Sequence, residues 1–337
     1  MHPAAPRVTV GVPVYNGAKF LAQTLDSILA QSFVDFEIVI CDNGSTDETA
    51  EICKAYERRD PRVRVWRSPT NMGPAANYNK CVELARGEFF KWAAADDILA
   101  PRFLELCVAA LDAEPSVVNA YPRTKRINER GEVFGEYQVE LDLNHPVTAV
   151  RYWRYLMCSH KKHHAAELWG VMRKSMLHQW SPINGAYPST DRVVTSKMIL
   201  SGRLRRVEEY LFFDREHSGR SEQQFDKSKI RNGSRLARYA GCGPTPPYQW
   251  WDSSKTGKIV FPEWRWVFEY FRGIFQVKLT PVQRISCFAV ASCLAIKFIP
   301  RLGRDLAIAS ELFAYRVAHK RASDAAPMPA AEAPDPA

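Results

Sequence analysis

The sequence predicts an α/β protein built on a doubly wound, mostly parallel, Rossmann-like sheet, with a helical extension at its C-terminus. Over the first 120 residues, short β-prone apolar runs alternate with segments of helical periodicity. This pattern is typical of parallel strands joined by crossover helices. Polar residues follow successive strands where each one ends, and the carboxyl ends of parallel strands share one edge, at which ligands bind. Beyond Pro247 the pattern is helical only.

The strands and helices of the first domain can be predicted in order. The first strand, Val8–Val14, ends at the turn signal Tyr15–Gly17, and the helix over 19–31 carries its apolar residues on one face. Further strands are predicted at 36–41, 63–67, 88–93 and 117–121, with helices that end near 58 and 85 and a third that begins at Pro101. The region 123–187 is irregular apart from a predicted strand at 167–173. A loop at 188–191 then leads into a helix over 191–201.

We expect three regions along the chain. Residues 1–220 form the α/β domain, residues 221–321 a basic helical region, and residues 322–337 a disordered tail rich in Ala and Pro. The longest apolar stretch, Ile285–Ile296, is shorter than the ~20 residues that a bilayer-spanning helix needs, so we expect a buried helix. A helix on a membrane surface is the alternative, because basic residues flank the stretch: Arg284, Lys297, Arg301 and Arg304.

The charge and the cysteines limit the partners and the location. The formal net charge of +9 favours anionic partners such as nucleotide diphosphates or anionic lipid. The basic residues are spread along the chain without a nucleic-acid-reading motif, so we expect no nucleic-acid partner. The eight cysteines form no C-x-x-C pair, and the N-terminus lacks a signal pattern. We therefore expect reduced core thiols in a cytoplasmic protein, with peripheral contact at the inner face of the membrane as the alternative.

Acidic and amide residues gather at the predicted sheet edge. Asp96 and Asp97 follow a strand directly, and two adjacent carboxylates suit a hard cation that bridges to phosphate oxygens. Asp42 also ends a strand and could accept a hydrogen bond from a base or ribose, while Asn71 and Asn16 end two others. The alternative for each acidic turn is an ordinary helix cap. The edge therefore predicts a binding site for a nucleotide and a metal ion.

Three segments resemble a known family in sequence, order and spacing. They are VTVGVPVYNG (8–17), DFEIVICDNGSTDET (35–49) and NMGPAANYNKCVELARGEFFKWAAADDILAPRFL (71–104). Together they resemble the inverting family 2 glycosyltransferases, which have a GT-A type nucleotide-binding fold. The resemblance is close over about residues 8–120 and looser as far as about residue 220.

The resemblance implies an activity and a set of donor-site residues. The implied reaction moves one sugar from a nucleotide-diphosphate donor, most often a UDP-sugar, to the hydroxyl of a glycan or lipid-linked acceptor. The anomeric configuration inverts, Mg²⁺ or Mn²⁺ assists, and the product enters glycan, glycolipid or polysaccharide biosynthesis. Asp97 would ligate the metal ion, and Asp96 would lie nearer the ribose. The remaining implied nucleotide contacts come from the first two motifs: Pro13, Tyr15, Asn16 and Asp42.

Two residues depart from the family pattern. The usual Asp-Asp after the second strand is Asp42-Asn43 here, and the earlier Asp of the metal motif is Ala94. These changes motivate an alternative function, a nucleotide-sugar-binding or scaffold protein without catalysis. A nucleotidyltransferase is disfavoured, because the segment VPVYNGAKF lacks a Gly-rich, Arg-containing loop. The Q-x-x-R-W pattern of processive synthases is absent, which favours transfer of a single sugar.

The catalytic base and a phosphate-facing loop are implied farther along the chain. Asp191, in YPSTDRVVTSKMILSGRL, best matches the family's base, which would remove the proton of the acceptor hydroxyl. A Gly202 turn and a closing strand should follow, and a helix cap is the alternative role for Asp191. His217 resembles a loop residue that meets the donor pyrophosphate, although a surface turn is the alternative reading. Glu216 is a second, weaker candidate for the base.

Overall fold

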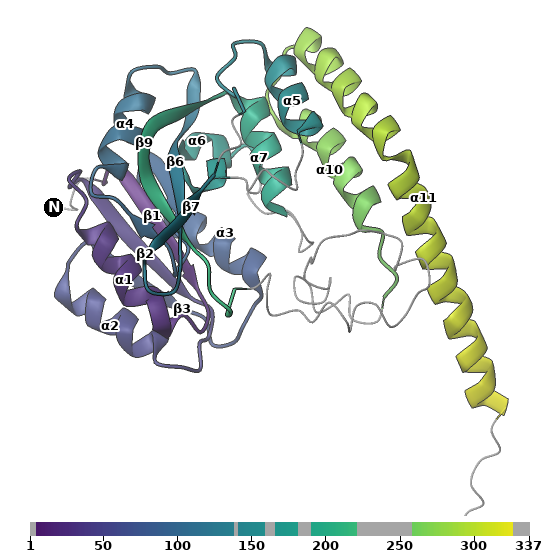
Figure 1. The fold of residues 1–337 in the computed structure, drawn as a ribbon, viewed down its shortest axis with the longest axis horizontal. Coiled ribbons are helices and arrows are strands. Elements are labelled where there is room, and N and C mark those ends of the chain that lie inside the picture. Colours follow the sequence, from purple (N-terminus) through teal and green to yellow (C-terminus); the bar gives the residue numbers. More distant parts are fainter. Residues whose placement is uncertain (1–4, 138–140, 159–165, 181–189, 221–257, 326–337) are drawn as a thin grey trace, which may run out of the picture.

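The computed structural model describes residues 5–137, 141–158, 166–180, 190–220 and 258–325. Its centre is a nine-stranded sheet in the order β3-β2-β1-β4-β8-β6-β9-β5, with β7 paired to β6 (Figure 1). The strands are β1 (Val8–Val14), β2 (Phe36–Asp42), β3 (Val63–Arg67), β4 (Phe89–Trp92), β5 (Ile98–Leu99), β6 (Val117–Ile127), β7 (Val133–Glu136), β8 (Val171–Arg173) and β9 (Arg203–Arg215).

The sheet joins a parallel half to a mixed half. Strands β3, β2, β1 and β4 pair in parallel. Strand β8 is antiparallel to both β4 and β6, and β9 is parallel to β6, so β6 and β9 run in the direction of the first four strands. The short strands β5 and β7 run the opposite way. The predicted doubly wound, mostly parallel α/β fold is confirmed.

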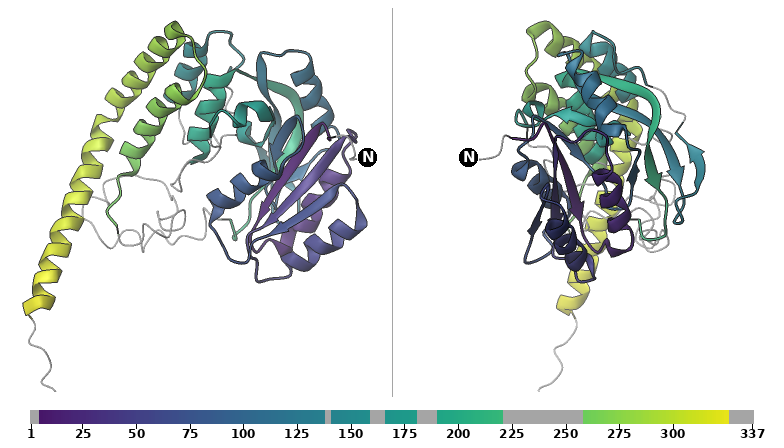
Figure 2. Two further views of the ribbon diagram at one scale, coloured as in Figure 1. Left: turned by 180° about the vertical axis from the view of Figure 1, so that it is seen from behind. Right: turned by 90° about the vertical axis from the view of Figure 1, so that its left-hand side faces the viewer.

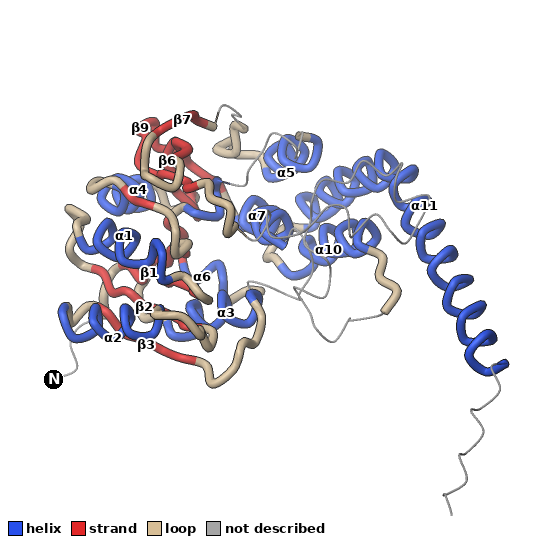
Figure 3. The backbone as a smooth tube through the Cα atoms, turned by 60° about the horizontal axis from the view of Figure 1, so that its bottom comes forward, coloured by secondary structure: helices blue, strands red, loops and turns tan. Residues whose placement is uncertain are grey.

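Helices cover both faces of the sheet, and a second group of helices extends beyond it. The helices of both groups, in chain order, are α1 (Ala18–Leu29), α2 (Thr49–Arg59), α3 (Pro74–Leu84), α4 (Phe103–Asp112), α5 (Thr148–Met157), α6 (Lys174–Leu177), α7 (Thr190–Ser201), α10 (Pro262–Gln276) and α11 (Pro281–Ala325). Figure 2 shows α10 and α11 beyond α5 and α7, with α11 projecting past the rest of the molecule. Figure 3 shows the same group on the side away from β1, β2 and β3.

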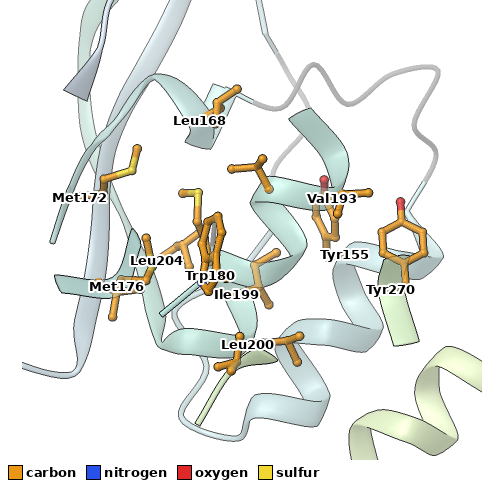
Figure 4. Close-up of a cluster of buried hydrophobic side chains, with 14 of the residues drawn as sticks. Tyr155, Leu168, Met172, Met176, Trp180, Val193, Ile199, Leu200, Leu204 and Tyr270 are labelled. Atoms are coloured by element: carbon orange, nitrogen blue, oxygen red, sulfur yellow. The ribbon is translucent and has the colours of Figure 1, made fainter. Parts of the chain in front are cut away.

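The alternation of side chains along the strands builds two cores. Val8, Val10, Val12 and Val14 of β1 all point to the face that α1 and α4 cover. The opposite face carries a second cluster, which includes Trp92 and is shared with α5, α7, α10 and α11. Figure 4 shows part of that second cluster, where side chains from β8, α6, α7 and α10 meet.

One glycine allows a helix to approach the sheet closely. A Cβ atom added at Gly11, in the middle of β1, would lie 2.7 Å from the Cβ of Cys81 on α3 and 2.9 Å from the ring of Phe90. Only glycine therefore fits where α3 crosses the strand. This close contact fixes α3 against the middle of β1.

Several predicted boundaries change in the structure. The expected strand over 167–173 is a 3₁₀ turn, Ala166–Trp169, followed by the short strand β8. The turn forms because the N–H of Gly170 donates to the carbonyl of Glu167, and the backbone of Gly170 packs tightly against the carbonyl of Ala120. The strand predicted at 117–121 continues to Ile127, and the helix predicted from Pro101 begins at Phe103.

The C-terminal region is only partly a buried helix. Along α11 one stripe, including Cys287, Leu294 and Phe298, is buried against α5 and α10. The rest of that helix exposes apolar side chains such as Ile285 and Ile296. Over Pro281–Glu311 the helix is long and apolar enough to cross a bilayer, with about a third of its most apolar window buried. The predicted boundary at 220 and the tail from 322 stay predictions, since 221–257 and 326–337 lie outside the described residues.

Among the described residues the cysteines are unpaired. Five of them are buried, Cys158 is half-buried, and Cys293 is exposed on α11. Burial raises the pKa of the Cys53 and Cys107 thiols to about 12, so both stay protonated at neutral pH. These thiols therefore behave as small apolar side chains, as expected from the sequence.

Candidate functional site

The turn after β1 is held by the turn after β2. Asn16 adopts the left-handed conformation with φ 51°, which asparagine tolerates well. Its backbone N–H donates to the Ser45 hydroxyl over 2.9 Å, while its side-chain oxygen accepts the N–H of Thr46 over 2.9 Å. Tyr15 next to it is about half exposed. The two strand ends therefore form one rigid ledge with an aromatic ring at its border.

Asp42 is fully buried at the end of β2. One carboxylate oxygen accepts the N–H of Ser45 over 2.9 Å. The other lies 3.2 Å from Nε of Arg67, yet it accepts no well-aligned hydrogen bond from any described residue. A buried oxygen with an open acceptor position suits a ligand N–H. The Asp42 side chain would have to become accessible before it could contact a base, so its base-reading role stays a prediction.

Asn43 has a local structural explanation. Its amide nitrogen donates to the side-chain oxygen of Asn71 over 2.8 Å and to the Gly73 carbonyl over 3.2 Å. Its amide oxygen accepts the N–H of Met72 over 2.9 Å. An aspartate at this position would place a carboxylate oxygen against the side-chain oxygen of Asn71 and the carbonyl of Gly73, and none of these atoms can donate a hydrogen bond. The asparagine therefore fits the loop that contains Asn71, and the oxygen of Asn71 is already engaged.

The two adjacent carboxylates face different surroundings. Asp97 is 5% exposed, and its Oδ1 accepts the backbone N–H of Arg215 over 2.9 Å. Burial, together with the carboxylates of Asp96 and Asp214, raises the pKa of Asp97. The side chain of Asp96 is 30% exposed instead, and its Oδ2 lies 2.9 Å from Nε2 of His217. Of the pair, Asp96 is the one that a ligand can reach.

Strand β9 brings His217 to this carboxylate. The Arg215 side chain, fully buried, donates from Nε to the Asp96 carbonyl over 2.8 Å and from Nη2 to Gln23 over 2.9 Å. Its guanidinium lies 4.6 Å above the ring of Phe20, and the His217 ring packs on the same phenylalanine at 4.8 Å. These contacts of Arg215 fix the end of β9, two residues before His217. Sequence reasoning includes Arg215 in the basic segment that would meet the donor pyrophosphate, but no local pattern indicates that its side chain is buried.

Asp191 lies in the first turn of α7, half-buried. Desolvation raises the pKa of the Tyr78 hydroxyl on α3, and the carboxylates of Asp96 and Asp191 raise it further. Asp96, predicted to lie nearer the ribose, and Asp191, the predicted base, therefore both act electrostatically on this tyrosine. Sequence reasoning missed Tyr78. The sequence feature that could have pointed to it is its place in the predicted helix that follows Asn71. The loop at 181–189 that precedes the helix lies outside the described residues.

Beside His217 lies an open cavity of about 590 Å³. It is formed by the turn between β6 and β7 and by the segment after β9, with Glu129, Phe134 and His217 among its walls. Glu216, the alternative base, also lines it but forms an ion pair with Arg126. Among the described residues no group of three or more His, Cys, Asp or Glu side chains forms a ready metal cage. Any ion would therefore need ligands from a donor or from water.

A family comparison decides the class of protein. The model of glycosyl transferase family 2 matches residues 9–178, just over half of the chain. The chain belongs to glycosyl transferase family 2. Within this family 2 glycosyltransferase, the matched part contains the ledge after β1 and β2 and the pair Asp96–Asp97, and ends before Asp191 and His217.

Curated relatives of this glycosyltransferase share only part of its length. It is 29% identical to chondroitin synthase of Escherichia coli over 167 residues, which are 49% of this chain and 24% of that protein. It is 34% identical to hyaluronan synthase of Pasteurella multocida over 128 residues, 38% of this chain and 13% of that one. A putative glycosyltransferase, EpsE of Bacillus subtilis, is 36% identical over 32% of this chain and 40% of its own. The glycosyltransferase thus spans well under two thirds of each of these relatives.

A solved structure extends the likeness to the whole fold. Residues 1–349 of TarS from S. aureus, solved in complex with UDP-GlcNAc, superpose with a TM-score of 0.55. The match covers 96% of this glycosyltransferase and 93% of that chain at 18% identity. Because identity is that low, the likeness shows the shared GT-A type fold and nothing finer.

Proposed function

We propose that this glycosyltransferase moves one sugar from a nucleotide-diphosphate donor to an acceptor hydroxyl with inversion, in glycan or glycolipid assembly. A UDP-sugar is the proposed donor. A divalent cation, held by Asp96 and His217, would neutralise the departing diphosphate. Asp191 would accept the proton of the attacking hydroxyl. The observation that carries this proposal is the meeting of Asp96 and His217, 2.9 Å apart, at the sheet edge.

The geometry of that pair fits a shared metal ion. Oδ2 of Asp96 and Nε2 of His217 lie 2.9 Å apart, and the Asp96 side chain is 30% exposed. A carboxylate oxygen and an imidazole nitrogen would therefore both be available to hold a divalent ion at this edge. An imidazole nitrogen is a softer ligand than the oxygens that Mg²⁺ prefers, which favours Mn²⁺ as the ion.

Asp97 supports the site from behind. The family resemblance implies that Asp97 ligates the metal, but one of its oxygens is engaged by the backbone of Arg215, and the side chain is nearly closed to solvent. We therefore propose Asp97 as a positioning residue, which ties the strand end after β4 to the end of β9. In this arrangement His217 reaches Asp96 because Asp97 and Arg215 fix both backbones.

The proposed base is supported by its neighbourhood. Desolvation raises the pKa of the Tyr78 hydroxyl, and the carboxylates of Asp96 and Asp191 both raise it further, which supports placing the proposed base on the same side of the site as Asp96. A hydroxyl deprotonated by Asp191 would attack from the face opposite the leaving group, and the anomeric carbon would invert. Glu216 is less suited, because Arg126 neutralises it.

Calorimetric titration of UDP against the full chain, with and without Mn²⁺, tests the donor site. We expect tight binding that needs the metal and that falls at least about tenfold in Asp96→Asn and in His217→Ala, because each loses one charge-assisted ligand. Asp35→Asn, which alters an exposed carboxylate far from the edge, is the matched control and should bind as the parent does. Equal binding by Asp96→Asn would refute the metal assignment.

Turnover separates catalysis from mere binding. With UDP-sugars and Mn²⁺ present, Asp191→Asn should retain donor affinity and lose most of the transfer rate. A general base contributes about 10²–10⁴-fold, so a loss of that size is expected. Metal-dependent binding without transfer or donor hydrolysis in the parent chain would favour the non-catalytic, nucleotide-sugar-binding alternative.

A further inference from the structure

Helix α10 has two opposite faces of different character. Its inner face is buried against α5 and α7: the Tyr270 carbonyl accepts the Tyr152 hydroxyl over 3.0 Å, and Gly273 faces Lys197 and Leu200 of α7. Its outer face carries Trp264, Phe268 and Phe275, which are 43%, 56% and 62% exposed. These three lie on one side of the helix, because their spacings of 4 and 7 residues are whole turns.

Helix α11 exposes apolar side chains of the same kind. Ile285, Phe288, Ile296 and Ile299 are each between 45% and 72% exposed. Their spacings, mostly three or eight residues, keep them along one side of the helix. The opposite side carries the buried stripe that packs on α5 and α10. The helix is therefore apolar on both sides, and the fold covers only one of them.

The two exposed stripes join. The ring of Phe271, on α10, lies 4.8 Å from the ring of Phe288 on α11. The Trp264 indole donates to the Leu302 carbonyl of α11 over 3.1 Å. We call the resulting surface the α10–α11 face, made of Trp264, Phe268, Phe275, Ile285, Phe288 and Ile299. Figure 2 shows these two helices side by side at the outside of the molecule.

Around this face the acidic side chains are buried and the exposed charged side chains are basic. Between residues 262 and 310, all of which the structure describes, every acidic side chain is buried: Glu263, Glu269 and Asp305. Glu269 is enclosed between Arg265 and Arg272, at 2.6 Å and 3.3 Å. The exposed charges of this stretch are cations, including Lys278, Lys297 and Arg301. Arg265 lies over the Phe268 ring and Arg284 over the Phe275 ring, so cations contact the face itself. Within residues 262–310 the face is thus an aromatic and aliphatic surface whose exposed charges are all positive.

A bilayer surface with anionic lipids fits this combination. Aromatic rings favour the boundary between headgroups and acyl chains, and neighbouring cations bind lipid phosphates. A second copy of the chain fits less well, since it would bring the same cations together. A spanning helix fits less well too, because α11 would have to leave the core that it shares with α5 and α10.

We infer that the α10–α11 face docks on an anionic membrane surface, with both helices in its plane, and that the acceptor is anchored in that membrane. The second half rests on the proposed function. Helix α7, which carries Asp191, packs on the inner side of α10. One helix, about 10 Å across, therefore separates the proposed base from the bilayer. An acceptor hydroxyl at Asp191 would lie just above the headgroups, within reach of a lipid anchor.

Vesicle co-sedimentation of the full chain without any donor tests the docking by itself. We expect binding to vesicles of phosphatidylcholine with phosphatidylglycerol and much weaker binding to phosphatidylcholine alone. Phe268→Glu/Phe275→Glu should lower the affinity by about tenfold or more, because two charges would enter the interface. Lys278→Glu/Lys297→Glu should remove the preference for the anionic lipid. The control Val34→Glu, at a 72% exposed valine far from this face, should bind like the parent.

Each outcome bears on one part of the inference. No binding to anionic vesicles, or binding that survives Phe268→Glu/Phe275→Glu, overturns the docking. Vesicle-bound protein that resists extraction at alkaline pH shows a spanning helix and also overturns it. A dimer that the phenylalanine variant abolishes assigns the face to a second copy. Donor hydrolysis should be unchanged in that variant, so a failure of the proposed donor site remains distinguishable from a failure of docking.

Discussion

Asn43 shows how one amide fits a site in which the family usually has a carboxylate. Its nitrogen donates to Asn71 and to the Gly73 carbonyl. We predict that Asn43→Asp lowers the free energy of unfolding by about 1–3 kcal/mol at pH 7, because a carboxylate would face two acceptors. The loss should shrink at low pH, where the introduced carboxyl can donate a proton. Chemical denaturation at pH 4 and pH 7 measures both values, and a pH-independent loss would contradict this explanation.

Lys91 is a buried cation without a carboxylate partner among the described residues. Its ammonium donates to the Trp92 carbonyl over 3.1 Å, lies 4.3 Å from the Phe103 ring, and has its pKa lowered by burial to about 7. The unfolded chain therefore binds more protons than the folded one between about pH 7 and pH 10.5. Over this window the contribution of Lys91 to stability rises with pH, and below pH 7 it is constant at its lowest value.

This linkage predicts a measurable difference between two proteins. Relative to Lys91→Met, the parent chain should gain about 2 kcal/mol of unfolding free energy between pH 7 and pH 9. Denaturant titrations of both proteins at the two pH values give the comparison. Parallel pH profiles would show that Lys91 titrates in the folded protein as it does in water.

At the level of elements, the contact between α3 and β1 is the most constrained. Gly11→Ala should cost about 1–3 kcal/mol, since its new methyl group would overlap Cys81 and Phe90. Gly135→Ala on β7 is a matched control, because the nearest atom to its new methyl is 3.9 Å away on a flexible arginine. Thermal unfolding of the two variants should separate them by several degrees. Similar melting temperatures would mean that α3 shifts without cost.

Elements with regular periodicity could be predicted from the sequence, and those made by tertiary pairing could not. Strand β1 is a continuous β-prone run, so its bounds are correct. Strand β5 has two residues and exists because it pairs with Phe212 and Phe213 of β9, more than 100 residues away. The helix α5 lies in the region considered irregular. The same limit applied to the site: Asp96 was found from its strand, whereas the contact with His217 depends on β9.

At the scale of the whole molecule, one core joins the α/β domain to α10 and α11. Tyr152, Leu200 and Ile274 belong to the same buried cluster. We predict that a chain ended at residue 220 is insoluble or molten, because it would expose that cluster. Soluble expression together with near-ultraviolet circular dichroism tests this. A folded, cooperative fragment would instead support the boundary at 220 as a true domain border.

Strand β9 lies inside the sheet, although it comes last along the chain among the strands that the structure describes. A nascent chain that has left the ribosome only as far as α6 has Asp96 and Asp97, but neither Arg215 nor His217 to meet them. The strand pair formed by β5 and β9 must close over more than 100 residues, which is slow compared with local helix formation. The proposed donor site would therefore be complete only late in synthesis, and a prematurely terminated chain would carry the family's motifs without the residues of β9 that we propose complete this site.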